Sequence, residues 1–261
     1  MGISPWMASF SLPTTLAQSP QVQILEKKSE EESQFSQKEE QAKQAITKWA
    51  KSDQDVFQQL DLFCKSLKDG MDRGALNEKD AEAVLGAAIF ATEKHKSQVR
   101  SNEKKTPYII HPIEVADLVM KIGHVYDKDV LITALLHDVM DDTQTTYEQI
   151  TSLYGTKVSS YLEEMTSKQG LSLKEQKKQQ IMQAFRQNPS VAIIKLSDKL
   201  SNLKTLATSP PPSWSRDRID QYFQWAQTVI ENLPESNQLL KKAVKNVISD
   251  YWEKQAQQKK S

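Results

Sequence analysis

Apolar residues recur along most of this chain at the three- and four-residue spacing of an α-helix. The segment 77–96 opens on Asn77, a favourable helix cap, and continues as NEKDAEAVLGAAIFATEKHK. The segment 111–123 begins with His-Pro and places its apolar residues on one face. The segment 127–140, DKDVLITALLHDVM, is apolar on almost every side. A helix of that kind has no solvent face, so this segment is predicted to be central and buried.

The second half of the chain continues the helical pattern. We expect two short helices in 147–170, separated at Gly155. The segment 191–206, VAIIKLSDKLSNLKTL, is ambiguous at its apolar start and helical from Leu196 onward. Further helices are predicted in 215–233 and 237–252. Because no segment sustains two-residue alternation of apolar and polar positions, the predicted fold is all-α.

The first 76 residues differ from the rest and are predicted to form an N-terminal extension. Residues 18–48 are rich in Gln, Glu, Lys and Ser, a composition that buries too little apolar surface to offset the entropy of ordering. We therefore expect 18–48 to be disordered or loosely helical. Apolar residues return at helical spacing in 46–69, which predicts an accessory helix. The main domain is then 77–255, followed by a polar tail at 256–261.

Composition excludes some classes of protein. Basic and acidic residues balance at 34 each, so no net charge attracts nucleic acid or an anionic membrane. The single cysteine, Cys64, excludes a disulfide framework. No apolar run reaches the roughly 20 residues of a membrane span. Residues 1–17 lack the basic start of a secretory signal, so we expect a cytoplasmic protein. Export is the alternative, if 1–17 end a longer signal.

The stretch ALLHDVMDDT at 134–143 concentrates groups that bind metals or move protons. His137 and Asp138 are adjacent, and adjacent residues of a helix point about 100° apart. They can share one ion only at the edge of a helix, with further ligands from elsewhere. His111, between two prolines, and Asp198, in an apolar surrounding, are the candidates for those ligands.

Two nitrogens and two carboxylates suit Mn²⁺, Fe²⁺ or Zn²⁺ better than Ca²⁺. The competing interpretation is the polar end of a helix that binds no metal, and spacing alone leaves both open.

Asp141 and Asp142 follow the His-Asp pair by four residues each, so each shares a helix face with one member of the pair. A carboxylate at that place can orient a water molecule or accept its proton, and two adjacent carboxylates raise each other's pKa. The alternative is a solvated acidic helix end, which the helix dipole disfavours.

Five segments in order resemble the HD superfamily, specifically the hydrolase domain of RelA/SpoT-type enzymes and the metazoan SpoT-like small alarmone hydrolases. The resemblance covers most of 77–252. It rests on the segments AIFATEKHKSQVR, TPYIIHPIEVA, ALLHDVMDDT, YGTKVSSYLEEMT and IIKLSDKLSNLKTL. It implies an HD-domain helical bundle. The ending WSRDRIDQYFQWAQTVIENL is similar to that of the hydrolase-only members.

The resemblance also implies an activity. These enzymes hold one Mn²⁺ ion and remove the 3′-pyrophosphate of ppGpp or pppGpp, leaving GDP or GTP; members also remove the 2′-phosphate of NADPH. The implied partner is thus a guanine nucleotide alarmone or NADPH, with no nucleic acid and no membrane. A nucleotide sensor with weakened catalysis is a third reading.

The resemblance assigns roles residue by residue. The implied metal ligands are His111, His137, Asp138 and Asp198, and the implied catalytic pair is Asp141 and Asp142. The implied substrate contacts are Arg100, Asn202, Trp214, Arg218 and Tyr222. The last three are four residues apart and are expected to form one helical stripe, with an arginine between two aromatic rings. Asp141 stands where the family has glutamate, which is one methylene longer.

Overall fold

The computed structural model describes residues 20–50, 53–167 and 170–258, and side chains from Gln34 onward. Regular structure in these residues is helical, and their only β pairing is an isolated bridge between Val99 and Pro107. The all-α prediction is confirmed. The elements are α1 (Pro20–Ala50), α2 (Gln54–Asp72), α3 (Glu78–Lys94), α4 (Ile110–Lys121), α5 (Lys128–Leu136), α6 (Val139–Asp142), α7 (Tyr147–Tyr154), α8 (Thr156–Met165), α9 (Leu173–Gln183), the 3₁₀ turn η2 (Ala184–Arg186), α10 (Pro189–Thr208), α11 (Arg216–Asn232) and α12 (Gln238–Gln258).

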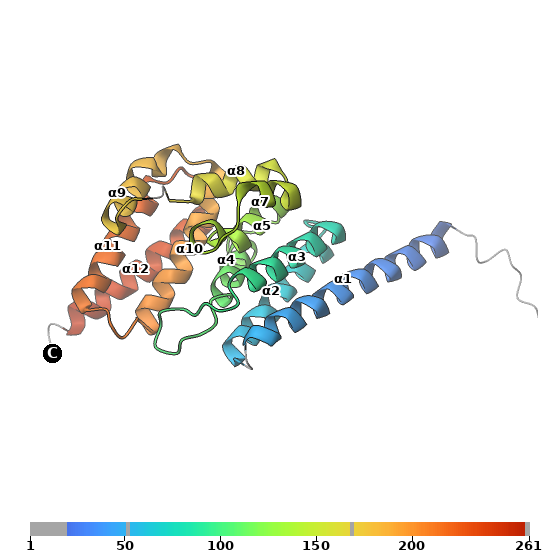
Figure 1. Ribbon diagram of the computed structural model, residues 1–261, viewed down its shortest axis with the longest axis horizontal. Helices are drawn as coiled ribbons and strands as arrows, with labels where there is room; N and C mark the ends of the chain where they lie inside the picture. Colours follow the sequence, from blue (N-terminus) through green and yellow to red (C-terminus); the bar gives the residue numbers. More distant parts are fainter. Residues whose placement is uncertain (1–19, 51–52, 168–169, 259–261) are drawn as a thin grey trace, which may run out of the picture.

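Helices α5 and α10 occupy the centre of the bundle (Figure 1). From Val130 to Leu136 every residue of α5 is buried, as its all-round apolar sequence predicted. Helix α5 packs against α3, α4, α8 and α10. The whole segment Pro189–Thr208 is α-helical, because Asn188 caps the helix and Pro189 lies in its first turn. The ambiguous apolar start of 191–206 is therefore a buried helix.

Residues 18–48 are the segment for which the sequence predicts disorder or a loose helix, and the part that the structure describes is helical. Residues 20–50 form the long helix α1, which packs along α3 at the opposite end of the molecule from α11 and α12 (Figure 1). The cause is the spacing of its few apolar residues, which fall on one face and are buried: Phe35, Ala42, Ile46 and Ala50. The average composition of 18–48 concealed this stripe.

The accessory helix expected at 46–69 begins later than predicted. Helix α1 continues to Ala50, and α2 starts at Gln54 under the side-chain cap of Asp53. Helix α2 packs against α4, so the core is continuous across residue 77. Asn77 caps α3 as predicted, with Oδ1 accepting from the backbone N–H of Asp80.

The remaining boundaries agree with the sequence pattern where the structure describes them. Gly155 separates α7 from α8 with a positive φ of 89°, a conformation that costs glycine little. Helix α12 extends to Gln258, so the first half of the predicted polar tail is helical. The candidate signal at 1–17 lies outside the described residues. Within those residues, no helix has the length and hydropathy of a membrane span.

Candidate metal centre and its adjoining cavities

The His-Asp pair lies at a break between two helices. Helix α5 ends at Leu136, His137 and Asp138 form a turn, and α6 starts at Val139. The turn brings the two side chains to the same place, with His137 Nε2 3.0 Å from Asp138 Oδ2. The break removes the difficulty that adjacent residues of a continuous helix diverge.

Two further elements bring their side chains to this point. His111 comes from the first turn of α4, and Asp198 from the middle of α10. His111 Nε2 lies 3.2 Å from Asp198 Oδ1 and 3.8 Å from Asp138 Oδ2, and His137 Nε2 lies 3.8 Å from Asp198 Oδ1. One donor atom each of His111, His137 and Asp198 lies within 4.8 Å of the other two, so these three residues could hold a metal ion. The structure thus brings all four predicted ligands together.

The tautomers of both histidines suit metal binding. Nδ1 of His137 lies 2.8 Å from the carbonyl oxygen of Ala134, which can only accept, so this nitrogen carries the proton. Nδ1 of His111 lies 2.9 Å from Ser201 Oγ, whose own proton goes to Glu114 Oε2 at 2.7 Å. Both Nε2 atoms then present lone pairs towards carboxylate oxygens. Lone pairs that face carboxylates favour a positive charge between them, which a proton or a divalent cation can supply.

The electrostatics of the cluster agree with this reading. His137 is 4% exposed, and its Nε2 has no hydrogen-bond partner among the described residues. Burial lowers the pKa of His137, but the carboxylates of Asp138 and Asp198 outweigh it and raise that pKa to about 9. Although burial opposes them, nearby positive charges hold the pKa of Asp138 and of Asp198 below the usual range. The site favours a cation in place of the proton.

The two candidate catalytic carboxylates lie on α6, beside this cluster. Burial, followed by the charges of Asp138 and Asp141, raises the pKa of Asp142 to about 6. Burial is also the main cause that raises the pKa of Asp141, whose Oδ2 accepts from the N–H of Ser167 at 3.5 Å. The sequence predicted raised pKa values through mutual repulsion, whereas desolvation contributes more in the structure.

Sequence reasoning missed a group of side chains that contact Asp138 and the backbone of α6. The hydroxyl of Tyr108 donates to Asp138 Oδ2 at 2.5 Å, and its ring packs 4.9 Å from the ring of His95. Gln98 connects His95 to α6: its Oε1 lies 2.7 Å from His95 Nδ1, and its Nε2 donates to the carbonyl oxygen of Asp142 at 2.8 Å. Tyr108 lies in the quoted TPYIIHP segment, so its distance of three residues from His111 was the available signal.

Asp198 is held by two neighbours on its own helix. Lys199 Nζ lies 2.7 Å from Asp198 Oδ2, and Asn202 Nδ2 donates to Asp198 Oδ1 at 2.5 Å. Lys199 is buried, and Asp198 raises its pKa in spite of that burial. The lysine was not singled out from the sequence, because a Lys beside an Asp on a helix usually points to solvent.

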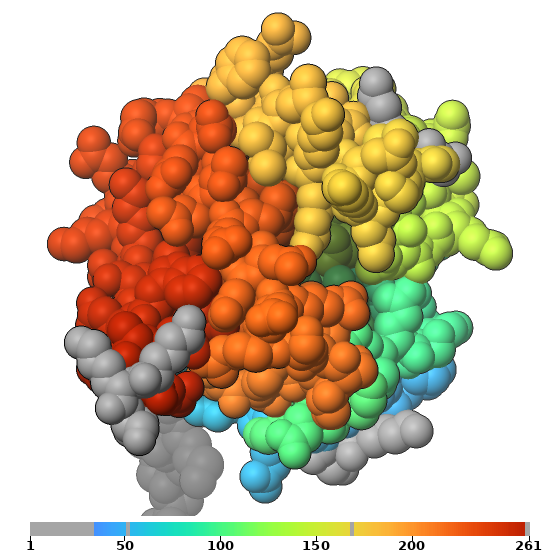
Figure 2. All heavy atoms as spheres, turned by 90° about the vertical axis from the view of Figure 1, so that its left-hand side faces the viewer, coloured from blue at the N-terminus to red at the C-terminus, as the bar shows by residue number. Residues whose placement is uncertain are grey.

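A cavity of about 200 Å³ adjoins the cluster and collects four of the five predicted substrate contacts. Its lining includes Arg100, Asn202, Trp214 and Tyr222. Nη2 of Arg100 donates to Asn202 Oδ1 at 2.9 Å, which connects two residues that are distant in sequence. Figure 2 shows a hollow on the face formed by the C-terminal helices, with green atoms lying deeper between yellow and orange segments.

The fifth predicted contact, Arg218, stacks on Trp214 at 4.2 Å from the ring centroid. The rings of Trp214 and Tyr222 are 5.9 Å apart. The three side chains therefore come together, but the predicted helical stripe is only partly correct. Helix α11 begins at Arg216, so Trp214 reaches the cluster from the preceding loop.

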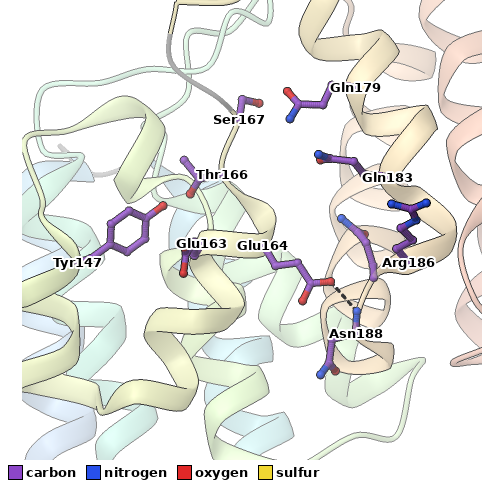
Figure 3. Close-up of a pocket in the computed structure, with 10 residues that line it drawn as sticks. Tyr147, Glu163, Glu164, Thr166, Ser167, Gln179, Gln183, Arg186 and Asn188 are labelled. Carbon is purple, nitrogen blue, oxygen red and sulfur yellow. Dashed lines mark hydrogen bonds between the residues drawn. The ribbon is translucent and has the colours of Figure 1, made fainter.

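A second and larger cavity, of about 780 Å³, lies between the end of α8 and the segment formed by α9 and η2 (Figure 3). Ser167, whose N–H donates to Asp141, is part of its lining. Across the cavity, Gln179, Gln183 and Arg186 project from α9 and η2. Glu164 accepts from the N–H of Asn188 at 2.5 Å and joins the two walls. Glu163, Glu164 and Thr166 of its lining lie in the segment YGTKVSSYLEEMT, to which the sequence analysis assigned no site residue.

The model of the HD domain family matches residues 87–224. This chain belongs to the HD domain family. The match includes all four candidate ligands of the HD protein and both α6 carboxylates. The RelA/SpoT-type resemblance stated from the sequence is confirmed by named relatives.

The HD protein is 40% identical over 171 residues to the guanosine-3′,5′-bis(diphosphate) 3′-pyrophosphohydrolase MESH1 of Xenopus tropicalis, which covers 66% of this chain and 96% of the relative. It is 39% identical to the Homo sapiens protein of that name, over 64% of this chain and 94% of the relative. A solved structure described as a metazoan ortholog of SpoT that hydrolyses ppGpp aligns with a TM-score of 0.63 and 34% identity, over 64% of this chain and 94% of that chain. The residues that the family model matches, 87–224, do not include α1.

Proposed function

We propose that this HD protein is a metal-dependent hydrolase that removes the 3′-pyrophosphate of ppGpp and pppGpp and releases GDP or GTP. The observation that carries the proposal is the convergence of His111, His137, Asp138 and Asp198, with both Nδ1 atoms engaged and both Nε2 atoms facing carboxylates. The relatives that carry this activity in their names match this chain over nearly their whole length.

The four ligands would hold one divalent cation, and we assign Mn²⁺ because a mixed set of imidazole and carboxylate suits it. A bound cation supplies Lewis acidity, which stabilises negative charge on phosphate and lowers the pKa of a water molecule. The rest of the chemistry belongs to side chains of this chain.

Asp142 would accept the proton of the attacking water. Its pKa of about 6 leaves it deprotonated at neutral pH and still basic enough for the transfer. The water oxygen bonds to the phosphorus attached to the ribose 3′ oxygen, the bond from that phosphorus to the 3′ oxygen breaks, and the released 3′ oxygen takes up a proton to become the 3′ hydroxyl. Asp141, whose carboxylate accepts from the N–H of Ser167, would orient the water.

The adjoining cavity supplies the substrate contacts. Arg100 and Arg218 carry positive charge for the phosphates, and Asn202 connects the cavity to the ligand Asp198. Trp214 and Tyr222 present ring surfaces to a nucleoside. The proposed partner is therefore a small nucleotide.

A turnover panel tests the proposal. Purified full-length protein would be treated with EDTA, dialysed, supplied with Mn²⁺ and given ppGpp, pppGpp or NADPH, with the products identified. We expect pyrophosphate from ppGpp and pppGpp, and no turnover before Mn²⁺ is restored. Orthophosphate from NADPH alone would assign the alternative phosphatase activity. Absence of turnover together with tight nucleotide binding would make the protein a sensor.

The control for the metal is His137→Ala. This variant should lose at least 100-fold in kcat and should bind less than one Mn²⁺ per chain by metal analysis. Full activity in this variant would refute the metal mechanism.

A further inference from the structure

The two histidines of the candidate metal centre are held through their Nδ1 atoms in different ways. Nδ1 of His137 lies 2.8 Å from the carbonyl oxygen of Ala134, a backbone group three residues earlier. Nδ1 of His111 lies 2.9 Å from Ser201 Oγ, a side chain of α10 that is 90 positions away in the sequence. The orientation of His111 therefore depends on a side chain of another helix, to which the proposed mechanism gives no role.

The hydroxyl of Ser201 is in turn bound by a carboxylate. Ser201 Oγ donates to Glu114 Oε2 at 2.7 Å. Glu114 follows His111 by three residues on α4, so the contacts run from α4 to α10 and return to α4. The other oxygen of the carboxylate, Oε1, lies 3.4 Å from Lys204 Nζ. A chain of hydrogen bonds thus connects the ligand His111 to an ion pair.

This chain runs from the interior of the protein to its surface. His111 is buried and Ser201 is completely buried, whereas 22% of the Glu114 side chain is exposed. Glu114 and Lys204 line a cavity of about 490 Å³ next to α12. The carboxylate therefore keeps contact with solvent, which reduces the cost of its charge. Its hydrogen bond to Ser201 lies in the interior, where such a bond is stronger than in water.

The carboxylate decides which way the hydrogen bonds point. Without Glu114, the hydroxyl of Ser201 could turn and donate to Nδ1 of His111. The proton of His111 would then be on Nε2, which lies 3.2 Å from Asp198 Oδ1 and could donate to it. That tautomer has no lone pair for a metal ion. Because Glu114 takes the single proton of Ser201, Nδ1 must donate and Nε2 stays available.

We propose that Glu114, acting through Ser201, fixes His111 in the tautomer and orientation that bind the metal ion and raises the strength of His111 as a ligand. Glu114 and Ser201 are positioning residues, since they act through His111. The inference rests on the proposed function, because it takes the His-Asp cluster as a metal centre. A carboxylate behind a metal-bound histidine raises the basicity of the ring, and here a hydroxyl transmits that effect.

Helix α10 offers a matched control for the test. Ser197 lies one turn before Ser201 and is equally buried, but its Oγ has no hydrogen-bond partner among the described residues. Full-length protein would be treated with EDTA, dialysed and titrated with Mn²⁺ by calorimetry. We expect the Kd of Mn²⁺ to rise about 10- to 100-fold in Ser201→Ala and to change by less than about twofold in Ser197→Ala.

Substitutions of Glu114 test the carboxylate itself. Glu114→Ala leaves Ser201 without an acceptor, so its Kd for Mn²⁺ should approach that of Ser201→Ala. Glu114→Gln keeps an oxygen that can accept from Ser201 and loses only the charge, so we expect a smaller rise of about threefold. Lys204→Met removes an exposed partner and should stay within about twofold of the wild type. Equal Kd values for Glu114→Ala and Lys204→Met would overturn the inference.

Two further measurements distinguish positioning from a purely structural role. Urea unfolding in EDTA reports the stability of each metal-free variant. If Ser201→Ala unfolds at lower urea concentration but binds Mn²⁺ with the Kd of the wild type, the role of Ser201 is structural and the inference is wrong. In turnover of ppGpp, the Mn²⁺ concentration for half-maximal rate should rise in Ser201→Ala by the same factor as Kd. The KM for ppGpp at saturating Mn²⁺ should not change.

The metal titration separates this inference from the proposed function, because it contains no nucleotide. A selective rise of Kd in Ser201→Ala and Glu114→Ala supports the positioning role even if no pyrophosphate is released in the turnover panel. Release of pyrophosphate together with equal Mn²⁺ affinities in the wild type, Ser201→Ala and Ser197→Ala would leave the function standing and refute the positioning role.

Discussion

The hydroxyl of Tyr108 donates a 2.5 Å hydrogen bond to Oδ2 of Asp138. The same oxygen lies 3.0 Å from Nε2 of His137, so Tyr108 holds the carboxylate in the orientation that faces the histidines. Burial and the charge of Asp138 raise the pKa of Tyr108, which keeps the phenol protonated and therefore a donor. A donor of this kind fixes a ligand before the metal arrives.

Replacing Tyr108 with phenylalanine should weaken metal binding and leave the fold unchanged. The ring keeps its contact with His95, and only the hydroxyl is removed. We expect the Mn²⁺ affinity to fall by about 10- to 100-fold, measured by calorimetric titration of the metal-free protein. Tyr154→Phe is the control, since its hydroxyl makes no hydrogen bond within the described residues. Equal Mn²⁺ affinities in the two variants would contradict the role given to Tyr108.

Asp142 should determine the acidic limb of the pH–rate profile. Its carboxyl must be deprotonated to accept a proton, and its raised pKa is about 6, so kcat/KM should rise with pH and level off above that value. A bound cation favours the carboxylate and moves this limb towards lower pH. The profile would be measured between about pH 4.5 and about pH 8, a range that spans that pKa.

Substitution of the two neighbouring carboxylates separates their roles. Asp142→Asn should lower kcat by about 10²- to 10⁴-fold, because the proton acceptor is lost. Asp141→Asn should cost less, because its amide oxygen can still accept from the N–H of Ser167. Steady-state kinetics with ppGpp measure both. If Asp141→Asn is the more damaging change, the assignment of the base to Asp142 is wrong.

Most of the site could be predicted from the sequence because its chemistry lies in short motifs. His111, His137, Asp138 and Asp198 were found as unusual polar residues in apolar segments, and the bundle brings them together. The turn at His137 and Asp138 could not be predicted, because the apolar pattern of residues 127–140 predicts one unbroken helix. Tertiary packing decides where that helix breaks.

The supporting side chains could not be predicted for a different reason. Lys199 is an ordinary helix residue in sequence, and its contact with the ring of Trp225 depends on another helix. The helical state of α1 depends likewise on α3. Lys38 lies close to Gly86, and Trp49 Nε1 donates to Glu93 Oε1 at 3.0 Å. These contacts between α1 and α3 stabilise the helical state of α1.

Asp117 should make the stability of the protein depend on pH. It is a buried carboxyl on α4, and it accepts from Ser66 Oγ at 2.5 Å and from Gln59 Nε2 at 3.2 Å, both on α2. Burial raises its pKa above the value of an unfolded chain. The folded state then binds the proton more tightly than the unfolded state, so this group's contribution to stability falls as pH rises from the unfolded pKa through the folded one.

The variant Asp117→Asn should remove that dependence. Its amide oxygen can still accept from Ser66, and no charge is buried, so the variant should unfold at higher urea concentration than the wild type at pH 7. Urea unfolding of both proteins at about pH 4, 5, 6 and 7 measures the difference in stability. These pH values lie above the pKa of an ordinary Asp. A difference between the two proteins that stays constant over this range would show that Asp117 does not titrate on folding.

Ile46 should show that α1 belongs to the folded core. Its side chain on α1 is fully buried in the core, although the composition of 18–48 predicted a disordered or loosely helical segment. Ile46→Ala removes buried methyl and methylene groups and leaves a cavity, which should cost about 2–4 kcal/mol of unfolding free energy. Gln41→Ala, at an exposed position of the same helix, should cost less than about 0.5 kcal/mol. Urea unfolding followed by circular dichroism measures both values.

If α1 were only loosely associated, Ile46→Ala would unfold at the same urea concentration as the wild type. A single unfolding transition at lower urea concentration would instead show that α1 and the HD helices unfold together, as a core that is continuous across residue 77 requires.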